Sequence, residues 1–151
     1  MRRTLPNLRR LVGDHLLINN RTIAFNRKAD YWLDLEDFTH LALEVSDSSK
    51  SKKIPLETLA AKAELYRGEF VHGFHVPNAP EFEQWVLMQR EHLRGQAIRM
   101  LTEVAQRYIW TKDFEAGLDT TRRLLYLEPW CEIAHYQQMI LLAHNGQRAL
   151  A

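Results

Sequence analysis

Apolar residues follow two different patterns along the chain, one before residue 26 and one after residue 34. Short β-prone runs flank Asn19 and Asn20, whereas from Asp34 onward apolar residues recur every three or four positions. Runs of this kind around an Asn pair favour a hairpin, because Asn tolerates the positive φ that tight hairpin turns need. Three-to-four spacing is typical of the buried face of a helix. The pattern predicts a mainly α-helical chain with β-structure confined to one hairpin.

The first part of the chain is expected to form a short helix and then this hairpin. The helix covers residues 4–12, and Gly13 ends it. The strands correspond to residues 15–18 and 22–25. The leucines on one face of the helix are expected to lie in a core: Leu5, Leu8 and Leu11.

The second part is expected to contain five helices. They cover residues 34–45, 55–66, 81–109, 114–127 and 130–144. Asp34 and Asp37 have the spacing of a capping box, and Pro55 suits the first turn of the second helix. The polar residues 46–53 are expected to form a surface loop, since they favour helices poorly.

The segment 68–80 is rich in Gly and Pro and is expected to be irregular. Its apolar side chains should nevertheless be held against a core: Phe70, Val71, Phe74 and Val76. The tryptophans stand among aliphatic residues, which predicts packing in the core or within a hairpin rather than base stacking: Trp32, Trp85, Trp110 and Trp130.

A weak internal repeat supports paired helices. Helical repeats of the tetratricopeptide type are about 34 residues long and place small residues where two antiparallel helices cross. With Pro129 at the end of such a unit, Gly117 occupies the crossing position and Ala105 lies on the preceding helix. The usual Trp of the repeat is missing, and the next unit is incomplete. The pattern predicts tetratricopeptide-like helical hairpins.

Charge is distributed unevenly along the chain. Residues 1–28 contain seven Arg or Lys and one acid, which gives +6, whereas the whole chain has a net charge of +1. A basic segment on an otherwise acidic chain is typical of contact with a polyanion, although a solvated basic terminus gives the same pattern. The candidate DNA-binding residues are Arg2, Arg3, Asn7, Arg9, Arg10, Asn20, Arg21 and Thr22.

Other kinds of function find little support in the sequence. No apolar run is long enough to span a membrane, no secretory signal is visible, and the single cysteine, Cys131, cannot form an internal disulfide. We therefore expect a cytoplasmic protein. His72 and His75 lack a third ligand at an obvious spacing, so no metal and no cofactor are expected. No nucleophile, base and orienting group can be named together, and we do not expect an enzyme.

Several segments, taken in order, resemble one bacterial family. They are Leu5 to Asp14, Thr22 to Asn26, Asp30 to Asp34, Leu65 to Phe70, Phe82 to Trp85, Leu124 to Trp130 and the pair Ala134-His135. The chain resembles activators of the Streptomyces antibiotic regulatory type, with the end of a winged helix followed by their bacterial transcriptional activator domain. No single segment is decisive, but the ordered set is fairly specific.

The resemblance implies a division of the chain and a function. Residues 1–28 would be the recognition helix and wing of a winged-helix DNA-binding domain, and residues 29–151 the tetratricopeptide-like activator domain. The family's winged helix has a sheet and two more helices before the recognition helix. We therefore expect the present chain to bind DNA poorly by itself.

The expected partners are double-stranded DNA in the complete protein, a second copy of the chain, and other regulator domains or the transcription machinery. No membrane partner is expected. A tetratricopeptide-like adaptor that binds proteins and not DNA is the alternative.

Overall fold

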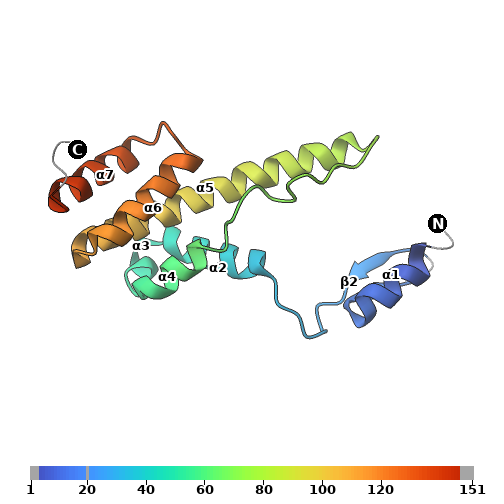
Figure 1. The fold of residues 1–151 in the computed structure, drawn as a ribbon. Helices are drawn as coiled ribbons and strands as arrows, with labels where there is room; N and C mark the ends of the chain where they lie inside the picture. Colours follow the sequence, from blue (N-terminus) through green and yellow to red (C-terminus); the bar gives the residue numbers. More distant parts are fainter. Residues whose placement is uncertain (1–3, 20, 147–151) are drawn as a thin grey trace. The chain divides into compact units, whose positions relative to one another are not determined.

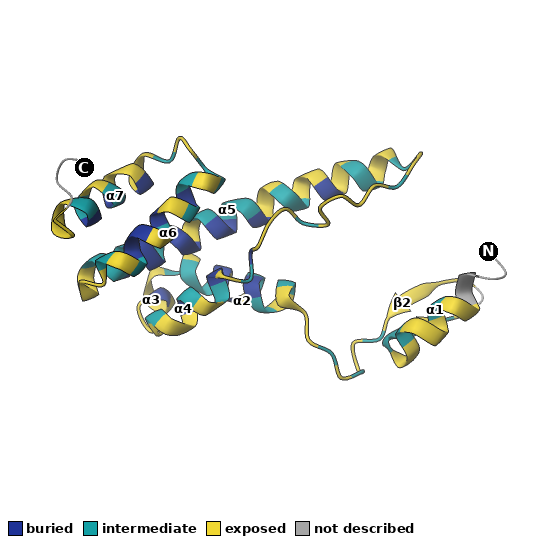
Figure 2. Cartoon of the chain, viewed as in Figure 1, coloured by how far each residue is buried: buried dark blue, intermediate teal, exposed yellow. Residues whose placement is uncertain are grey.

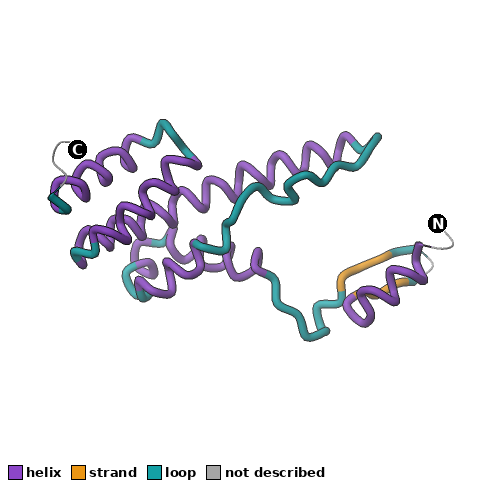
Figure 3. Tube along the Cα trace, in the orientation of Figure 1, coloured by secondary structure: helices purple, strands orange, loops and turns teal. Residues whose placement is uncertain are grey.

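A computed structural model describes residues 4–19 and 21–146. The chain divides into two compact units, Met1–Leu33 and Asp34–Ala151. The first unit combines one helix with the two-stranded sheet, and the second is helical (Figures 1 and 3). The prediction of a mainly α-helical chain with one hairpin is confirmed.

The first unit begins with α1 (Thr4–Val12), which ends at Gly13, where φ is +53°. A 3₁₀ turn, η1 (Gly13–His15), leads into β1 (Leu16–Ile18), which pairs antiparallel with β2 (Ile23–Phe25). The register places Leu16 opposite Phe25 and Ile18 opposite Ile23. The predicted helix and hairpin are therefore both present.

Asn19 holds the hairpin turn by a different means from the one expected. Its φ is not positive, and its side-chain oxygen accepts hydrogen bonds from the backbone amides of Arg21 at 2.8 Å and Thr22 at 2.7 Å. This side chain replaces a backbone acceptor, as Asn commonly does in turns. Asn20 lies outside the described residues.

The expectation of a leucine core under α1 is wrong for Leu11, whose side chain is 78% exposed. Leu8 is half-buried, and the side chain of Leu5 lies outside the described part. None of the described side chains in this unit is fully buried, because one short helix on a two-stranded sheet provides too little surface to enclose them. The apolar face of α1 is thus largely uncovered.

The second unit contains six helices among its described residues. They are α2 (Asp34–Ser46), α3 (Ser48–Ser51), α4 (Leu56–Ala63), α5 (Pro80–Thr111), α6 (Phe114–Leu127) and α7 (Glu132–His144). All five predicted helices are present. The second is three residues shorter at its C-terminus than expected, and the last begins at Glu132 rather than Trp130.

The predicted loop at residues 46–53 contains the short helix α3, so that prediction is wrong. Asp47 precedes the helix, and its carboxylate accepts hydrogen bonds from the Ser49 amide at 3.0 Å and from the Ser49 hydroxyl at 2.7 Å. This N-terminal cap compensates for the poor helix propensity of the serines. Ser51, at the end of the helix, is buried.

Helix α5 is the central element of the second unit, and it contacts α2, α4, α6 and α7. Helix α6 returns along α5, and α7 returns along α6 (Figure 1). Buried positions face inward along these helices, as Figure 2 shows. The core includes Leu59, Met100, Leu124 and Leu141, all completely inaccessible at 0% exposure. Consecutive antiparallel pairs of this kind are the predicted tetratricopeptide-like hairpins.

The segment between α4 and α5 follows the N-terminal half of α5. Phe70 is half-buried and contacts Trp85 edge-on at 5.7 Å between ring centroids, and the Arg90 side chain donates to the Phe70 carbonyl at 2.9 Å. Val71 and Phe74 are exposed, which corrects the expectation that both would be buried. Phe74 contacts Phe82 of α5 edge-on, with 5.9 Å between ring centroids.

Candidate functional site

Five of the eight candidate DNA-binding residues lie in the described part of the first unit. Asn7, Arg9 and Arg10 belong to α1, and Arg21 and Thr22 lie between the two strands; all five are exposed. Arg2, Arg3 and Asn20 lie outside the described residues. The unit therefore presents basic side chains on both its helix and its hairpin.

Arg9 links these two elements. Its guanidinium Nη2 donates to the carbonyl oxygen of Ile18 at 3.1 Å, at the end of β1. The base of the hairpin is closed separately, because Asn26 donates from its backbone to His15 and from its side chain to Asp14, both at 2.8 Å. The last turn of α1 is thus held beside the hairpin turn, and a positive charge lies at their junction.

Arg10 and Arg21 have no hydrogen bond or ion pair from their side chains to any residue that the structure describes. Each guanidinium carries a full positive charge and five N–H donors. Arginines of this kind can pair with phosphate oxygens or with the O6/N7 edge of guanine. Their availability distinguishes them from Arg9, one of whose donors is already used.

All four tryptophans are exposed, which overturns the expectation that they pack inside the fold. Trp130 is the extreme case, with 88% of its surface accessible. It precedes α7, whose outward residues Ile133, Tyr136 and Met139 are also exposed. The spacing among aliphatic residues suggested burial, but aliphatic neighbours such as Leu33, Leu87 and Ile133 are exposed as well, so these neighbours do not mark a buried face. The last helical pair consequently has an apolar outer face.

The two loop histidines bind carboxylates. His75 Nδ1 lies 2.9 Å from Glu83 Oε1, which also accepts a hydrogen bond from the Val76 amide at 3.0 Å, and His72 lies 3.8 Å from Glu69. The two Glu83 contacts attach the loop to the start of α5, whereas the His72–Glu69 contact lies within the loop. Within residues 4–19 and 21–146, no group of three His, Cys, Asp or Glu side chains is arranged to hold a metal ion.

Sequence reasoning missed three arginines that bind backbone carbonyls across helices. Arg107 donates to the carbonyls of Ser51 at 2.6 Å and Ile54 at 2.5 Å. Arg94 donates to Leu127, and Arg123 donates to Ala63 and Tyr66. The Leu127 carbonyl lies at the end of α6, where the last carbonyls have no partner within their own helix. The Ser51 and Ala63 carbonyls also accept from backbone amides, so there the arginines add a second hydrogen bond. In the sequence these arginines look like ordinary charged residues on a solvent-exposed helix face, and no sequence pattern distinguishes them from such residues.

The helical unit has the architecture of a tetratricopeptide-like regulatory domain. The family model for the bacterial transcriptional activator domain matches residues 33–151, and the chain belongs to this family. The domain is therefore a helical domain of the transcriptional activator type, as the resemblance implied. Searches among curated proteins and among solved structures found no match. Among the described residues, no helix is both long enough and apolar enough to cross a bilayer.

Proposed function

We propose that the chain is part of a DNA-binding transcriptional activator that works in the cytoplasm and has no catalytic activity. The proposal rests on the exposed basic side chains of the first unit, which precedes a domain of the transcriptional activator family along the chain. Residues 1–28 carry a net charge of +6. Neutralising phosphates with Lys and Arg supplies most of the non-specific affinity of proteins for DNA.

The two basic elements have different proposed roles. The exposed side of α1 faces the major groove and the hairpin turn contacts the DNA backbone, as in other winged-helix proteins. The hydrogen bond from Arg9 to Ile18 supports a fixed spacing between the two elements. Arg10 is then the better candidate for a base edge, because its donors are not used within the described part of the chain.

The exposed apolar side of α1 limits the affinity for DNA that we expect of this chain. A helix of nine residues is marginal in water, and Leu11 has little to pack against. We expect the chain to bind DNA weakly and without sequence preference. Sequence-specific affinity is expected only in a protein that also carries the sheet and two helices of the family's winged helix.

Binding isotherms on duplex DNA at increasing salt test this proposal. The expected affinity is measurable at low salt and falls steeply as salt rises, because counterions are released on binding. A tetratricopeptide-like adaptor without DNA-binding activity would show no salt-dependent affinity. Tight, sequence-specific binding by the present chain would contradict the expected limit on α1.

We further propose that the helical domain self-associates and contacts other regulator domains through the outer face of α7. Met139 is 52% exposed there, beside Tyr136 and Ile133, while Leu142 is half-buried. Light scattering over a wide concentration range should show a dimer, and Tyr136→Glu with Met139→Glu should shift it to a monomer. The matched control is Leu43→Glu on α2, which is also exposed and should leave the mass unchanged. A monomer at every concentration would contradict self-association.

A further inference from the structure

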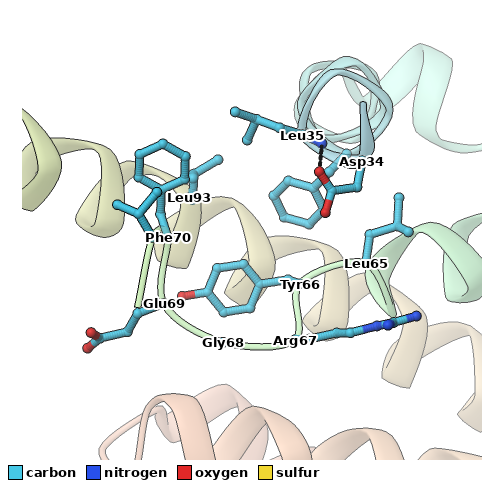
Figure 4. Close-up of a pocket in the computed structure, with 11 residues that line it drawn as sticks. Asp34, Leu35, Leu65, Tyr66, Arg67, Gly68, Glu69, Phe70 and Leu93 are labelled. Carbon is cyan, nitrogen blue, oxygen red and sulfur yellow. Dashed lines mark hydrogen bonds between the residues drawn. The ribbon is translucent and has the colours of Figure 1, made fainter. Parts of the chain in front are cut away.

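The helical unit contains a cavity of about 400 Å³ between α2, the segment after α4, and α5. Figure 4 shows Leu35 and Asp34 on one side, Leu93 and Phe70 on another, and Tyr66 between Leu65 and Glu69. Six of the eleven residues that line the cavity are apolar: Leu35, Phe38, Leu65, Phe70, Val71 and Leu93. Ligand sites typically have volumes of roughly 300–1,000 Å³ and walls of this apolar kind.

Tyr66 is a buried residue with a polar group that lines this cavity. Its side chain is 9% exposed, and its ring contacts Phe38 with 5.9 Å between ring centroids. The backbone carbonyl of Tyr66 accepts a hydrogen bond from Arg123 at 2.5 Å, so the residue is fixed in place.

The Tyr66 hydroxyl has no hydrogen-bond partner among the residues that the structure describes. Among the described side chains, the fully enclosed polar atoms that lack a hydrogen-bond partner belong to His15, Gln96 and Gln137. The Tyr66 hydroxyl is not one of them, so it is not fully enclosed by protein atoms. A buried tyrosine usually finds a partner for its hydroxyl. Tyr66 lines this cavity as well as a neighbouring hollow with Arg94 and Tyr126. A molecule bound in the cavity would supply the hydrogen bond that the hydroxyl lacks.

The charged side chains that line the cavity do not favour an ion as its ligand. Asp34 is occupied in accepting a hydrogen bond from the Leu35 amide at 2.7 Å, and Glu69 lies 3.4 Å from Arg90. Arg67 adds one positive charge, which offsets the negative charge of Asp34. An anion or a cation would therefore lose its hydration without gaining a matched counter-charge.

We propose that this cavity binds a small, uncharged, mainly apolar molecule whose single oxygen hydrogen-bonds to the Tyr66 hydroxyl. The hydroxyl can both donate and accept, so a phenol, an alcohol or a ketone fits. Burial raises the pKa of Tyr66, so the hydroxyl stays protonated and able to donate at neutral pH. The site does not depend on DNA binding, because every residue that lines it belongs to the helical unit.

The test uses the ¹⁵N-labelled chain and 4-propylphenol as the probe, followed by amide chemical shifts. Saturable shifts are expected at residues 65–71 and at Leu35 and Leu93, with a dissociation constant of about 1 mM or tighter, which is a modest affinity for a probe of this size. The charged analogue 3-(4-hydroxyphenyl)propionate should bind at least five-fold more weakly. No saturation, shifts confined to other regions, or equal binding of the charged analogue would overturn the proposal.

Tyr66→Phe isolates the hydroxyl, because it keeps the ring and removes only the oxygen. It should weaken binding of 4-propylphenol by about five-fold or more while leaving the rest of the spectrum unchanged. Tyr126→Phe is the matched control, since Tyr126 is exposed and does not line this cavity; its affinity should stay within two-fold. Equal affinity of the Tyr66→Phe variant and the parent chain would show that the hydroxyl does not recognise the ligand.

Discussion

Gly117 on α6 lies so close to Leu141 on α7 that a Cβ atom at position 117 would come within 2.5 Å of Leu141 Cδ2. The same Cβ would lie 3.3 Å from the Cβ of Tyr108 on α5. Leu141 is completely buried and cannot move aside freely. Glycine at this position therefore allows three consecutive helices to pack closely, as the repeat pattern predicted.

Gly117→Ala should destabilise the helical unit. Overpacking typically costs about 1–3 kcal/mol, and the better helix propensity of Ala returns about 1 kcal/mol, so we expect a net loss of up to about 2 kcal/mol. The measurement is urea unfolding followed by circular dichroism at 222 nm. Gly95→Ala is the control, because its Cβ would meet only Arg99 Nη1 at 3.7 Å; this variant should be equally stable or more stable. If both variants changed stability alike, close packing at Gly117 would not be the cause.

Arg107→Met should also lower the free energy of unfolding. The substitution keeps an apolar stem but removes the donors to the carbonyls of Ser51 and Ile54. The Ile54 carbonyl loses its donor, whereas the Ser51 carbonyl keeps its hydrogen bond from the Ile54 amide. One buried polar group without a partner costs about 1–3 kcal/mol, so we expect a loss of this size. Thermal and urea unfolding measure the change.

Two further variants test whether the loss of stability comes from the hydrogen bonds of Arg107. Arg107→Lys keeps the charge but cannot reproduce the planar fork of donors, so its stability should lie between those of the parent and Arg107→Met. Arg122→Met removes an exposed arginine that pairs with Asp119 one turn away, and it should change stability by less than about 0.5 kcal/mol. Equal losses at Arg107 and Arg122 would indicate a general effect of charge and not of the two carbonyls.

Asp47 should titrate below its ordinary value. The Ser49 hydroxyl and then the Ser49 amide donate to its carboxylate and lower its pKa. Because the folded pKa is depressed, the stabilisation of α3 is present above the ordinary pKa and is lost as pH falls through the lowered value. A ¹³C NMR titration of the carboxyl group measures this pKa, and Ser49→Ala should raise it. A pKa at or above the ordinary value in the parent chain would refute the proposed cap.

The helices and the hairpin could be predicted from sequence because their signals are local. Three-to-four spacing and a terminating Gly13 define α1, and similar spacing defines the long helices of the second unit. Helix α3 could not be predicted, since its serines are poor helix formers and the cap from Asp47 offsets this only in the folded geometry. Gly117 could be recognised because the repeat fixes where two helices cross.

The surfaces could not be predicted in the same way. Whether a tryptophan faces inward depends on which helix lies opposite it, and within the described part of the chain Trp130 stays 88% exposed. Likewise, Arg9 and Arg10 look identical in the sequence, yet the Ile18 carbonyl occupies only Arg9. The Tyr66 cavity depends on three segments distant in the chain, which no local pattern encodes.

The central claim is that the first unit contacts DNA through its exposed arginines. The direct test compares the Arg10→Ala/Arg21→Ala variant with Lys52→Ala/Lys53→Ala, which removes the same charge from exposed positions of the helical unit. Fluorescence anisotropy on a labelled duplex, repeated over a salt series, gives the affinity and its salt slope. Each lost phosphate contact reduces the slope by about 0.9, so we expect a reduction of about 2 and weaker binding for the arginine variant, with no change for the lysine variant. Equal effects of the two variants, or no effect of either, would contradict the claim.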